Sequence, residues 1–390
     1  MKRVYLDNNA TTPLDKEVKE AIIETLDMYG NPSSHHTMGR IARDKIEEAR
    51  ANIAMFINAD PDEIIFTSGG SESNNIVMRS MLCSHDCRYS SKRNMTKKFI
   101  TSSVEHPAVL ETAKLLACES VDTIQVPVDK YGIVIAEELE KEINKGADLV
   151  SIMYANNEVG TIQPIKQFAD IAHEKGILFH TDAVQVPTKL KIDVKDLNVD
   201  YLSLSGHKMY APKGVGILYS KKTTNLCPLI SGGHQEKGLR AGTENTIGII
   251  AMGKSAQVAM RDQEKEIEVV GKLRDKLEKG LLERIPNSFI NGHPDLRVPN
   301  TTNISFSFIE GESILYMLDH VGVEVSTGSA CSSGSLDPSH VLTAMKTDIE
   351  HTHSSIRMSL GKHTTEEEID YVLSVFPPII EKLRKMSPFS

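Results

Sequence analysis

Two apolar segments that each lead into a reactive polar residue place the strongest limit on how this chain of 390 residues can fold. The first, Ile177–Phe179, continues into His180–Gln185, which contains Asp182. The second, Tyr201–Ser205, is followed closely by Lys208. Both are short and apolar, as buried parallel strands are. Because open α/β sheets bind ligands at the carboxyl ends of their strands, the sequence predicts that Asp182 and Lys208 lie close together at that edge.

An acid and a lysine in one crevice are the two groups that a buried pyridoxal phosphate requires. The lysine can form a Schiff base with the aldehyde of the cofactor. The aspartate can keep the ring nitrogen protonated, so that the ring takes up the electrons of a substrate carbanion. Taken alone the pair is moderate evidence, because Asp and Lys are common at strand ends. The residues around it strengthen the interpretation.

A cup for the phosphate group is predicted where the strand-like segment Ile64–Phe66 leads through glycines into a helical pattern that starts near Ile76. Glycine lets backbone N–H groups approach an oxyanion, and the start of a helix adds its positive end. Gly70 and the hydroxyl of Ser71 lie in this turn. An ordinary glycine-rich turn would have the same sequence, but Asp182 and Lys208 favour the cofactor. Ser205 and His207, next to the lysine, are two further donors.

Helical and strand-like patterns alternate along the chain, which predicts a large doubly wound domain over residues 14–260 with a mixed or parallel sheet. The segment Leu14–Tyr29 is predicted to be its first helix. A charged helical pattern, Arg261–Arg284, leads into a smaller α/β domain, to which residues 1–13 and 261–390 are assigned. Its last helix begins with a capping box, Thr365 with Glu368, and contains Pro377–Pro378, which should kink or end it.

The composition excludes some classes of function. The net charge of −9 argues against direct binding of nucleic acid. No stretch has the length and apolarity of a membrane span, and the first residues lack the apolar core of a signal peptide. We therefore expect a cytoplasmic protein with reduced thiols and no membrane association.

The chain resembles the cysteine desulfurases, in the NifS/IscS-like branch of the fold-type I pyridoxal-phosphate enzymes, which are class V aminotransferase-like. The resemblance runs nearly end to end. Besides the Asp182 and Lys208 segments, the motifs that carry it are Tyr5–Pro13, Gly30–Ser34, Phe66–Ser73, Glu105–His106, Asn156–Gly160, Arg240–Thr243, Gly328–Cys331 and Ser354–Arg357.

The resemblance implies a reaction in which L-cysteine becomes L-alanine and its sulfur is transferred to a cysteine of the enzyme as a persulfide. In that reaction Lys208 carries the cofactor and moves protons, and His106 stacks on the ring and shuttles protons. Arg357 binds the substrate carboxylate through its planar fork of donors. The other implied contacts are those of Asn156 and Gln185 with the ring hydroxyl and substrate, of Gly70, Ser71, Ser205 and His207 with the phosphate, and of Thr243 with the phosphate of a neighbouring subunit.

Several of these residues have simpler interpretations. His106 precedes Pro107, so it can serve only to start a helix, and Asn156 or Gln185 can cap a strand end. Arg357 can be an exposed strand arginine. The contact implied for Thr243 predicts a homodimer with shared active sites. The resemblance also implies a protein that accepts the sulfur, such as an Fe–S scaffold, although the sequence does not identify it.

Cys331 is predicted to be the nucleophile. It lies in a run of small residues, about 326–337, that offers little apolar material for packing, so the loop should be reachable by solvent and mobile. An ordinary thiol is only about 3% ionised at pH 7, and we therefore expect the site to lower its pKa or to supply a base. For Cys118 and Cys227 the default expectation is a small buried side chain.

One polar, basic segment, Cys83–Lys98, is predicted to be an exposed insertion. Cys83, His85 and Cys87 could bind a metal ion, but they are crowded and have no second cluster of ligands. We therefore predict a surface loop here and no metal.

Three other functions remain open. One is an aminotransferase or lyase that acts on another amino acid. Another is a selenocysteine lyase or cysteine-sulfinate desulfinase, which needs no sulfur-accepting thiol. The last is a binding or assembly protein that keeps the cofactor only for its structure. Replacement of Cys331 by Ala separates the first two from a desulfurase, and the third predicts no turnover.

Overall fold

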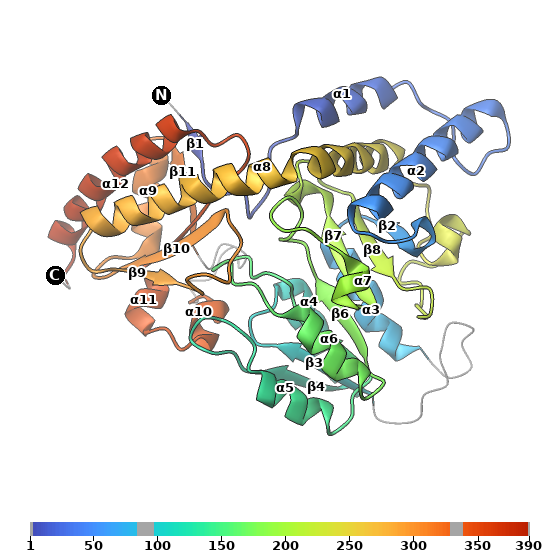
Figure 1. Ribbon diagram of the computed structural model, residues 1–390, viewed down its shortest axis with the longest axis horizontal. Helices are drawn as coiled ribbons and strands as arrows, with labels where there is room; N and C mark the ends of the chain where they lie inside the picture. Colours follow the sequence, from blue (N-terminus) through green and yellow to red (C-terminus); the bar gives the residue numbers. More distant parts are fainter. Residues whose placement is uncertain (1–2, 84–96, 328–337, 389–390) are drawn as a thin grey trace.

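The computed structural model describes residues 3–83, 97–327 and 338–388. Its larger part is built on a sheet with the strand order β2–β8–β7–β6–β5–β3–β4 (Figure 1). Neighbouring strands from β4 to β7 run parallel, whereas β8 is antiparallel to both β2 and β7. The strands are β2 (Ile64–Thr67), β3 (Lys98–Ser102), β4 (Asp122–Val126), β5 (Leu149–Ser151), β6 (Leu178–Asp182), β7 (Tyr201–Ser205) and β8 (Gly216–Ser220). The α/β class and the mixed sheet predicted from the sequence are confirmed.

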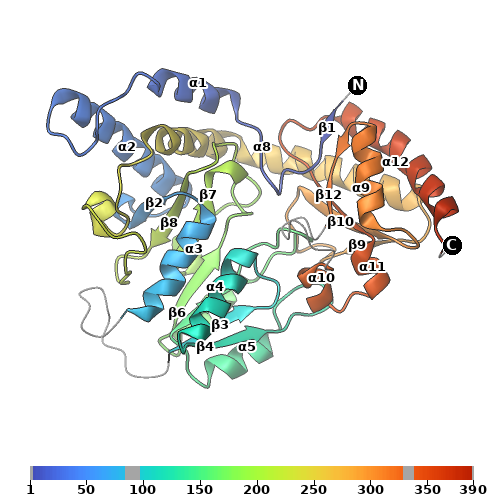
Figure 2. The same cartoon turned by 180° about the vertical axis from the view of Figure 1, so that it is seen from behind.

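Consecutive residues of the strands point to opposite faces of this sheet, and each face carries its own core. Phe99 and Leu149 face the core formed with α3 (Gly70–Arg79) and α4 (Pro107–Cys118). The next residues, Ile100 and Val150, face the other core. That second core includes α2 (Thr37–Phe56), α5 (Ala136–Ile143), α6 (Ile165–His173) and α7 (Val194–Leu197). Helices therefore cover both faces, as Figure 2 shows from behind.

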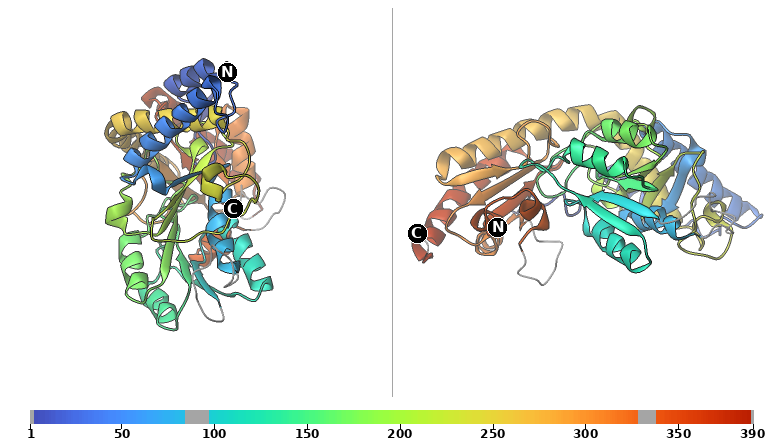
Figure 3. Two further views of the ribbon diagram at one scale, coloured as in Figure 1. Left: turned by 90° about the vertical axis from the view of Figure 1, so that its right-hand side faces the viewer. Right: turned by 90° about the horizontal axis from the view of Figure 1, so that it is seen from below.

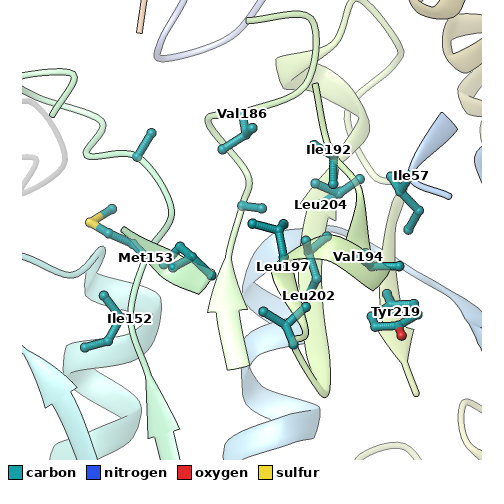
Figure 4. Close-up of a cluster of buried hydrophobic side chains, with 14 of the residues drawn as sticks. Ile57, Ile152, Met153, Val186, Ile192, Val194, Leu197, Leu202, Leu204 and Tyr219 are labelled. Carbon is teal, nitrogen blue, oxygen red and sulfur yellow. The ribbon is translucent and has the colours of Figure 1, made fainter. Parts of the chain in front are cut away.

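Close packing beneath the ends of β6 and β7 gives the site a firm base. Leu202 and Leu204 of β7 lie against Val194 and Leu197 of α7, and Val186 lies beyond the end of β6 (Figure 4). All of these side chains are at most 7% exposed. Interiors of this density leave little freedom for the turns that carry Asp182 and Lys208.

A smaller antiparallel sheet, in the order β12–β13–β10–β9, forms the second part of the molecule. The strands are β9 (Ser288–Asn291), β10 (Thr301–Phe306), β12 (Ser326–Thr327) and β13 (Ser355–Ser359). The N-terminal strand β1 (Val4–Tyr5) pairs with β11 (Val323–Glu324), so the start of the chain lies with this part. The accompanying helices are α9 (Gly311–His320), α10 (His340–Ala344), α11 (Ile349–His353) and α12 (Glu366–Met386). The two parts lie end to end in the right-hand view of Figure 3, which is seen from below.

A single helix, α8 (Thr246–Arg284), runs along both parts (Figure 1). The sequence predicted a helix only over Arg261–Arg284, but the observed one has 39 residues. Its first half contributes Met252 and Ala256 to the larger core, and its second half contributes Leu277 to the smaller one. The predicted division between residues 260 and 261 falls inside this helix. The first helix of the chain, α1 (Lys16–Thr25), is shorter than expected and packs on α8.

The last helix, α12, does not end at its two prolines. Its capping box forms as predicted, with Thr365 and Glu368 each bonded to the backbone of the other. Pro377 has no N–H for the carbonyl oxygen of Leu373, four residues earlier. The Nη1 of Arg284 donates to that oxygen over 2.7 Å. Of the two predicted effects, an end of the helix at the prolines is wrong, and a kink there stays a prediction. Arg284 of α8 supplies a donor to the carbonyl group that proline leaves without a partner.

The expectations for the cysteines need correction. Cys118 is exposed rather than buried, because it occupies the C-terminal end of α4. Cys227 is half-buried, and it forms a disulfide with Cys83, with a Cα–Cα distance of 6.6 Å across 144 residues. The expectation of reduced thiols is therefore wrong for this pair. Cys83 and Lys98 at the ends of the predicted insertion are described, whereas His85 and Cys87 lie outside the described residues. In the described ranges no helix has the length and apolarity needed to cross a membrane.

Candidate active site

A cavity of about 250 Å³ opens at the carboxyl ends of β6 and β7, where the sequence placed the site. The residues that line it come from both sheets and from the N-terminal arm. Of the predicted site residues, nine line it: Gly70, Ser71, His106, Asp182, Gln185, Ser205, His207, Lys208 and Arg357. The strands β6 and β7 run in parallel with Asp182 opposite Ser203, and this pairing brings the Asp182 and Lys208 segments together.

Asp182 is held by two donors at the end of β6. Its Oδ2 accepts a hydrogen bond of 2.7 Å from Asn74, and its Oδ1 accepts one of 3.0 Å from the backbone N–H of Val184. Both bonds fix the orientation of the carboxylate. Sequence reasoning missed Asn74, although it follows Ser71 by one helical turn and so shares its face of α3.

Lys208 lies on the 3-10 turn Gly206–Lys208 that follows β7. Its Nζ donates to the carbonyl oxygens of Asn9 and Ala10, and the N-terminal arm therefore lies over it. Next to it, Nδ1 of His207 lies 3.2 Å from the hydroxyl of Thr11. Burial lowers the pKa of His207 to about 4, and the charge of Lys208 adds to this effect. His207 is therefore neutral at pH 7 and can still donate a hydrogen bond.

The predicted phosphate cup has the tight backbone that its glycines allow. Gly69 takes φ 156° and ψ −179°, a region that is almost restricted to glycine. The strand β8 approaches so closely that a Cβ at Gly216 would lie 2.6 Å from the Cα of Gly69. The helix α3 begins at Gly70, where a Cβ would lie 2.5 Å from Val184. The cup therefore presents the N–H groups and the positive end of α3 to the cavity.

His106 caps the helix α4, as the simpler interpretation expected, and it also lines the cavity. Its Nδ1 accepts a hydrogen bond of 3.1 Å from Ala108, so in the neutral ring the proton is on Nε2. Burial lowers the pKa of His106, and Lys208 acts in the same direction while Asp182 opposes it. In the neutral ring, Nδ1 therefore faces the start of α4, and the N–H at Nε2 is on the opposite side of the ring.

Arg357 is buried in the middle of β13, with its side chain 2% exposed, and the exposed-arginine interpretation is wrong. Its Nη2 pairs with Oδ1 of Asp7 at 2.8 Å, and its Nη1 donates to the carbonyl oxygen of Asn157 at 3.0 Å. Among the described residues no acceptor reaches its Nε. The guanidinium is thus oriented by the N-terminal arm and by the larger part of the molecule together.

Three predicted site residues, Asn156, Thr243 and Cys331, are not among the residues that line the cavity in the described part of the chain. The side-chain oxygen of Asn156 accepts from the backbone N–H groups of Glu158 and Val159, whereas the next residue, Asn157, does line the cavity. Thr243 is exposed and is absent from the lining, so its contact with a neighbouring subunit stays a prediction. Cys331 lies outside the described residues.

Sequence reasoning also missed Asn9 and Lys189, which hold side chains that line the cavity. The carbonyl oxygen of Asn9 accepts hydrogen bonds from both Lys208 and Gln185. Lys189, which is 5% exposed, donates to the side-chain oxygen of Gln185 over 3.1 Å. In the described ranges no group of three or more His, Cys, Asp and Glu side chains is arranged to hold a metal ion.

The arrangement fits pyridoxal phosphate. The cavity offers N–H and O–H donors at the start of α3, an oriented carboxylate and an amine, which match the phosphate, the ring nitrogen and the aldehyde of the cofactor. The side-chain oxygen of Asn74, buried beside Asp182, has no partner in the described part of the chain. At Gly70, which lines the cavity, a Cβ would lie 2.5 Å from Val184, so a larger residue would not fit there without a shift of that side chain.

Comparison with known proteins agrees with this chemistry. The family model of the class-V aminotransferases matches residues 4–372. The chain is 51% identical to the cysteine desulfurase IscS of Dictyoglomus turgidum over 391 residues, which cover 100% of this chain and 98% of the relative. It is 46% identical to the cysteine desulfurase NifS of Azotobacter vinelandii, with 100% and 95% coverage.

Solved structures agree as well. A NifS-like protein superposes with a TM-score of 0.90 at 40% identity, covering 98% of this chain and 100% of that one. A structure described as SspA in complex with cysteine gives a TM-score of 0.80 at 34% identity, covering 93% and 100%.

Proposed function

This chain belongs to the aminotransferase class-V family and, within it, to the cysteine desulfurases that depend on pyridoxal phosphate, and we propose that it passes sulfur from L-cysteine to its own Cys331. In this reaction the C–S bond of the substrate breaks and an S–S bond forms on the Cys331 thiolate. The bonding electrons stay with the carbon, which takes up a proton, and L-alanine leaves. The observation that carries the proposal is the joint placement of Asp182, Lys208 and Arg357 around one cavity.

When bound, the cofactor supplies an electron sink for the carbanion at the substrate Cα. The residues that would hold it are Asp182 at the ring nitrogen, Lys208 at the aldehyde, and Gly70, Ser71, Ser205 and His207 at the phosphate. Neutral His207 and the start of α3 would offer donors there without a second full positive charge.

Two residues are proposed to move protons. Lys208, as a free amine, would take the proton from Cα and return one to the product. His106 would act from Nε2, because its Nδ1 is engaged by Ala108. Burial lowers the pKa of His106, so it would enter the reaction as a neutral ring with its proton on Nε2. To take up a proton at Nε2, its own proton would first have to move to Nδ1, which would break the bond from Ala108.

Arg357 is proposed to bind the substrate carboxylate. Its Nε is buried without an acceptor in the described part of the chain, and Asp7 and Asn157 fix the plane of the guanidinium. A pre-oriented fork binds a carboxylate with little loss of conformational entropy. The role proposed for Asn156 is indirect, since its side chain holds the turn that carries Asn157.

We further propose a homodimer in which Thr243 reaches the phosphate of the partner site, and two units over residues 14–260 and over 1–13 with 261–390. The exposed position of Thr243 supports the dimer. A cytoplasmic location and delivery of the sulfur to an Fe–S scaffold or another acceptor protein complete the proposal. The family to which the chain belongs supports this destination.

The test is the release of sulfide and alanine from L-cysteine in the presence of a reductant, with wild type and Cys331→Ala compared. We expect equal amounts of the two products from the wild type and almost none from the variant. Alanine from both would remove the thiol from the mechanism and favour a lyase. No product from either, with cofactor visibly bound, would leave a binding protein. Activity of the variant on selenocysteine or cysteine sulfinate alone would favour those substrates.

A further inference from the structure

Lys189 is a buried amine that the mechanism above does not use. It lies in the irregular turn after β6, four residues beyond Gln185, and its side chain is 5% exposed. Backbone bonds from Val186 to Ala183 and from Lys189 to Val186 fold this turn back on itself. Lysine is among the residue types least often buried, because a charged amine loses its hydration there. The burial of Lys189 therefore needs a compensating contact.

The contact of Lys189 with Gln185 determines which way the glutamine amide points. Lys189 carries only donors when it is protonated, and it donates to Oε1 of Gln185 over 3.1 Å. On the other side, Nε2 of Gln185 donates to the carbonyl oxygen of Asn9 over 2.9 Å. A carbonyl oxygen can only accept. Lys189 and Asn9 therefore both favour the same orientation of the Gln185 amide, whose oxygen and nitrogen could otherwise exchange places.

The surroundings of Lys189 lower its pKa, so that it can donate to Gln185 without placing a full positive charge beside the cavity. Burial, together with the nearby cations Lys208 and Arg357 and against the opposing charge of Glu266, lowers the pKa of Lys189 to about 7. Glu266 is half-buried and accepts a hydrogen bond of 2.6 Å from Tyr210. A neutral amine still has N–H groups to donate, so the bond to Gln185 persists in both protonation states.

We propose that Lys189 is a positioning residue: it holds the Gln185 amide with its oxygen turned away from the cavity and its N–H groups turned toward it. The inference rests on the proposed place of Gln185 beside the ring hydroxyl of the cofactor. Lys189 does not itself line the cavity, so it acts through Gln185 alone. Without Lys189 the amide would keep only the Asn9 contact, which Lys208 shares.

Lys189→Met tests this, because methionine has a similar length and is apolar but cannot donate a hydrogen bond. Lys191→Met, at an exposed lysine two residues away, is the matched control. We expect the affinity for pyridoxal phosphate to fall about 5-fold, on the scale of one lost hydrogen bond, and the pH midpoint of the absorbance of the bound cofactor to move. The control should match the wild type in both measurements. Neither readout requires turnover or Cys331.

A double-mutant cycle separates positioning from a general structural role. In a Gln185→Ala background, Lys189→Met should cost almost nothing more in cofactor affinity, because the residue through which it acts is already gone. Additive losses would overturn the proposal, as would an unchanged spectrum and affinity in Lys189→Met. Lys189→Gln, which is neutral and retains donors, should recover most of the affinity and serves if the methionine variant does not fold.

Two outcomes complete the test. Unfolding of both Lys189 variants would assign the residue to the core and overturn the positioning role. If the wild type bound no pyridoxal phosphate, the proposed function would fail first, before any variant were compared. The two failures are therefore distinguishable.

Discussion

The site has two walls that are built in different ways. The cofactor wall, meaning Asp182, Ser205 and Lys208, stands on adjacent strand ends of the seven-stranded sheet and rests on one dense core. The carboxylate clamp, meaning Arg357, lies in the middle of a strand of the smaller sheet. Its orientation depends on Asp7 from the N-terminal arm and on Asn157 from the larger part. Neighbouring strand ends place the residues of the first wall, and contacts across 108 and 199 residues then orient Asp182 and Lys208. Among the described residues the clamp has no such neighbour in its own sheet, and contacts across 200 and 350 residues orient it.

This difference teaches that attachment of the cofactor and recognition of the substrate can be changed separately. A defect in the cofactor wall should affect everything that depends on the cofactor. A defect in the clamp should weaken the binding of cysteine and leave the cofactor in place.

Removal of the amine in Lys208→Ala should have the largest effect. We expect kcat to fall by on the order of 10³-fold or more, because both the attachment of the cofactor and a proton-transfer group are lost. Borohydride reduction followed by mass spectrometry should find the cofactor on the wild-type chain and on none of the variant. Lys213→Ala, at an exposed lysine nearby, is the control. A variant that keeps full turnover would remove Lys208 from the cofactor wall.

Arg357→Lys should separate the two walls. Lysine keeps the charge but loses the planar fork, and we expect kcat/KM for L-cysteine to fall roughly 10- to 100-fold, mainly through KM. The affinity for pyridoxal phosphate should change less than about 2-fold. Arg261→Lys, on the exposed surface of α8, controls for the exchange of residue type. A loss of cofactor as large as the loss of substrate binding would contradict the separation.

The smallest effect concerns the core below the cofactor wall. His180 of β6 lies between the hydroxyls of Ser151 and Ser203, and burial lowers its pKa from 6.5 to about 3. The unfolded chain therefore binds a proton below pH 6.5, whereas the native state does so only near pH 3. Through this group the protein should lose stability as the pH falls from about 6.5 toward 3, at roughly 1.4 kcal/mol per pH unit.

Denaturant titrations at several pH values measure this slope. His180→Asn, which carries no titrating group, should have a flatter dependence over the same range, even though its stability at pH 7 is lower. His320→Asn, at an exposed position on α9, should retain the dependence of the wild type. Equal slopes for all three proteins would show that His180 does not contribute.

The parts of the site that could be predicted are those set by local chain geometry. Asp182 and Lys208 follow recognisable strands, and parallel strands end at one edge. The contacts of Asn74 and Asn9 could not be found in this way, because their partners lie 108 and 176 residues away. Lys189 lies only four residues from Gln185, but their contact depends on the irregular turn between them. Asn156 and Asn157 are adjacent in sequence, and only the observed turn separates the one that holds the backbone from the one that lines the cavity.

The same distinction applies to the fold. The strand β7 matches its predicted bounds, since its alternating apolar residues are followed at once by Gly206. The continuation of α12 through Pro377 depended on Arg284, which lies 89 residues from Leu373 in the chain. No local pattern contains that information.

The long helix α8 also bears on how the protein folds. At 1.5 Å per residue its 39 residues span about 58 Å, and its side chains belong to the hydrophobic cores of both parts. Disruption of one core would expose one half of this helix and remove support from the other half. We therefore expect the unfolding of the two parts to be coupled through this helix. The walls of the site should thus be gained or lost together, even though they are built from different sheets.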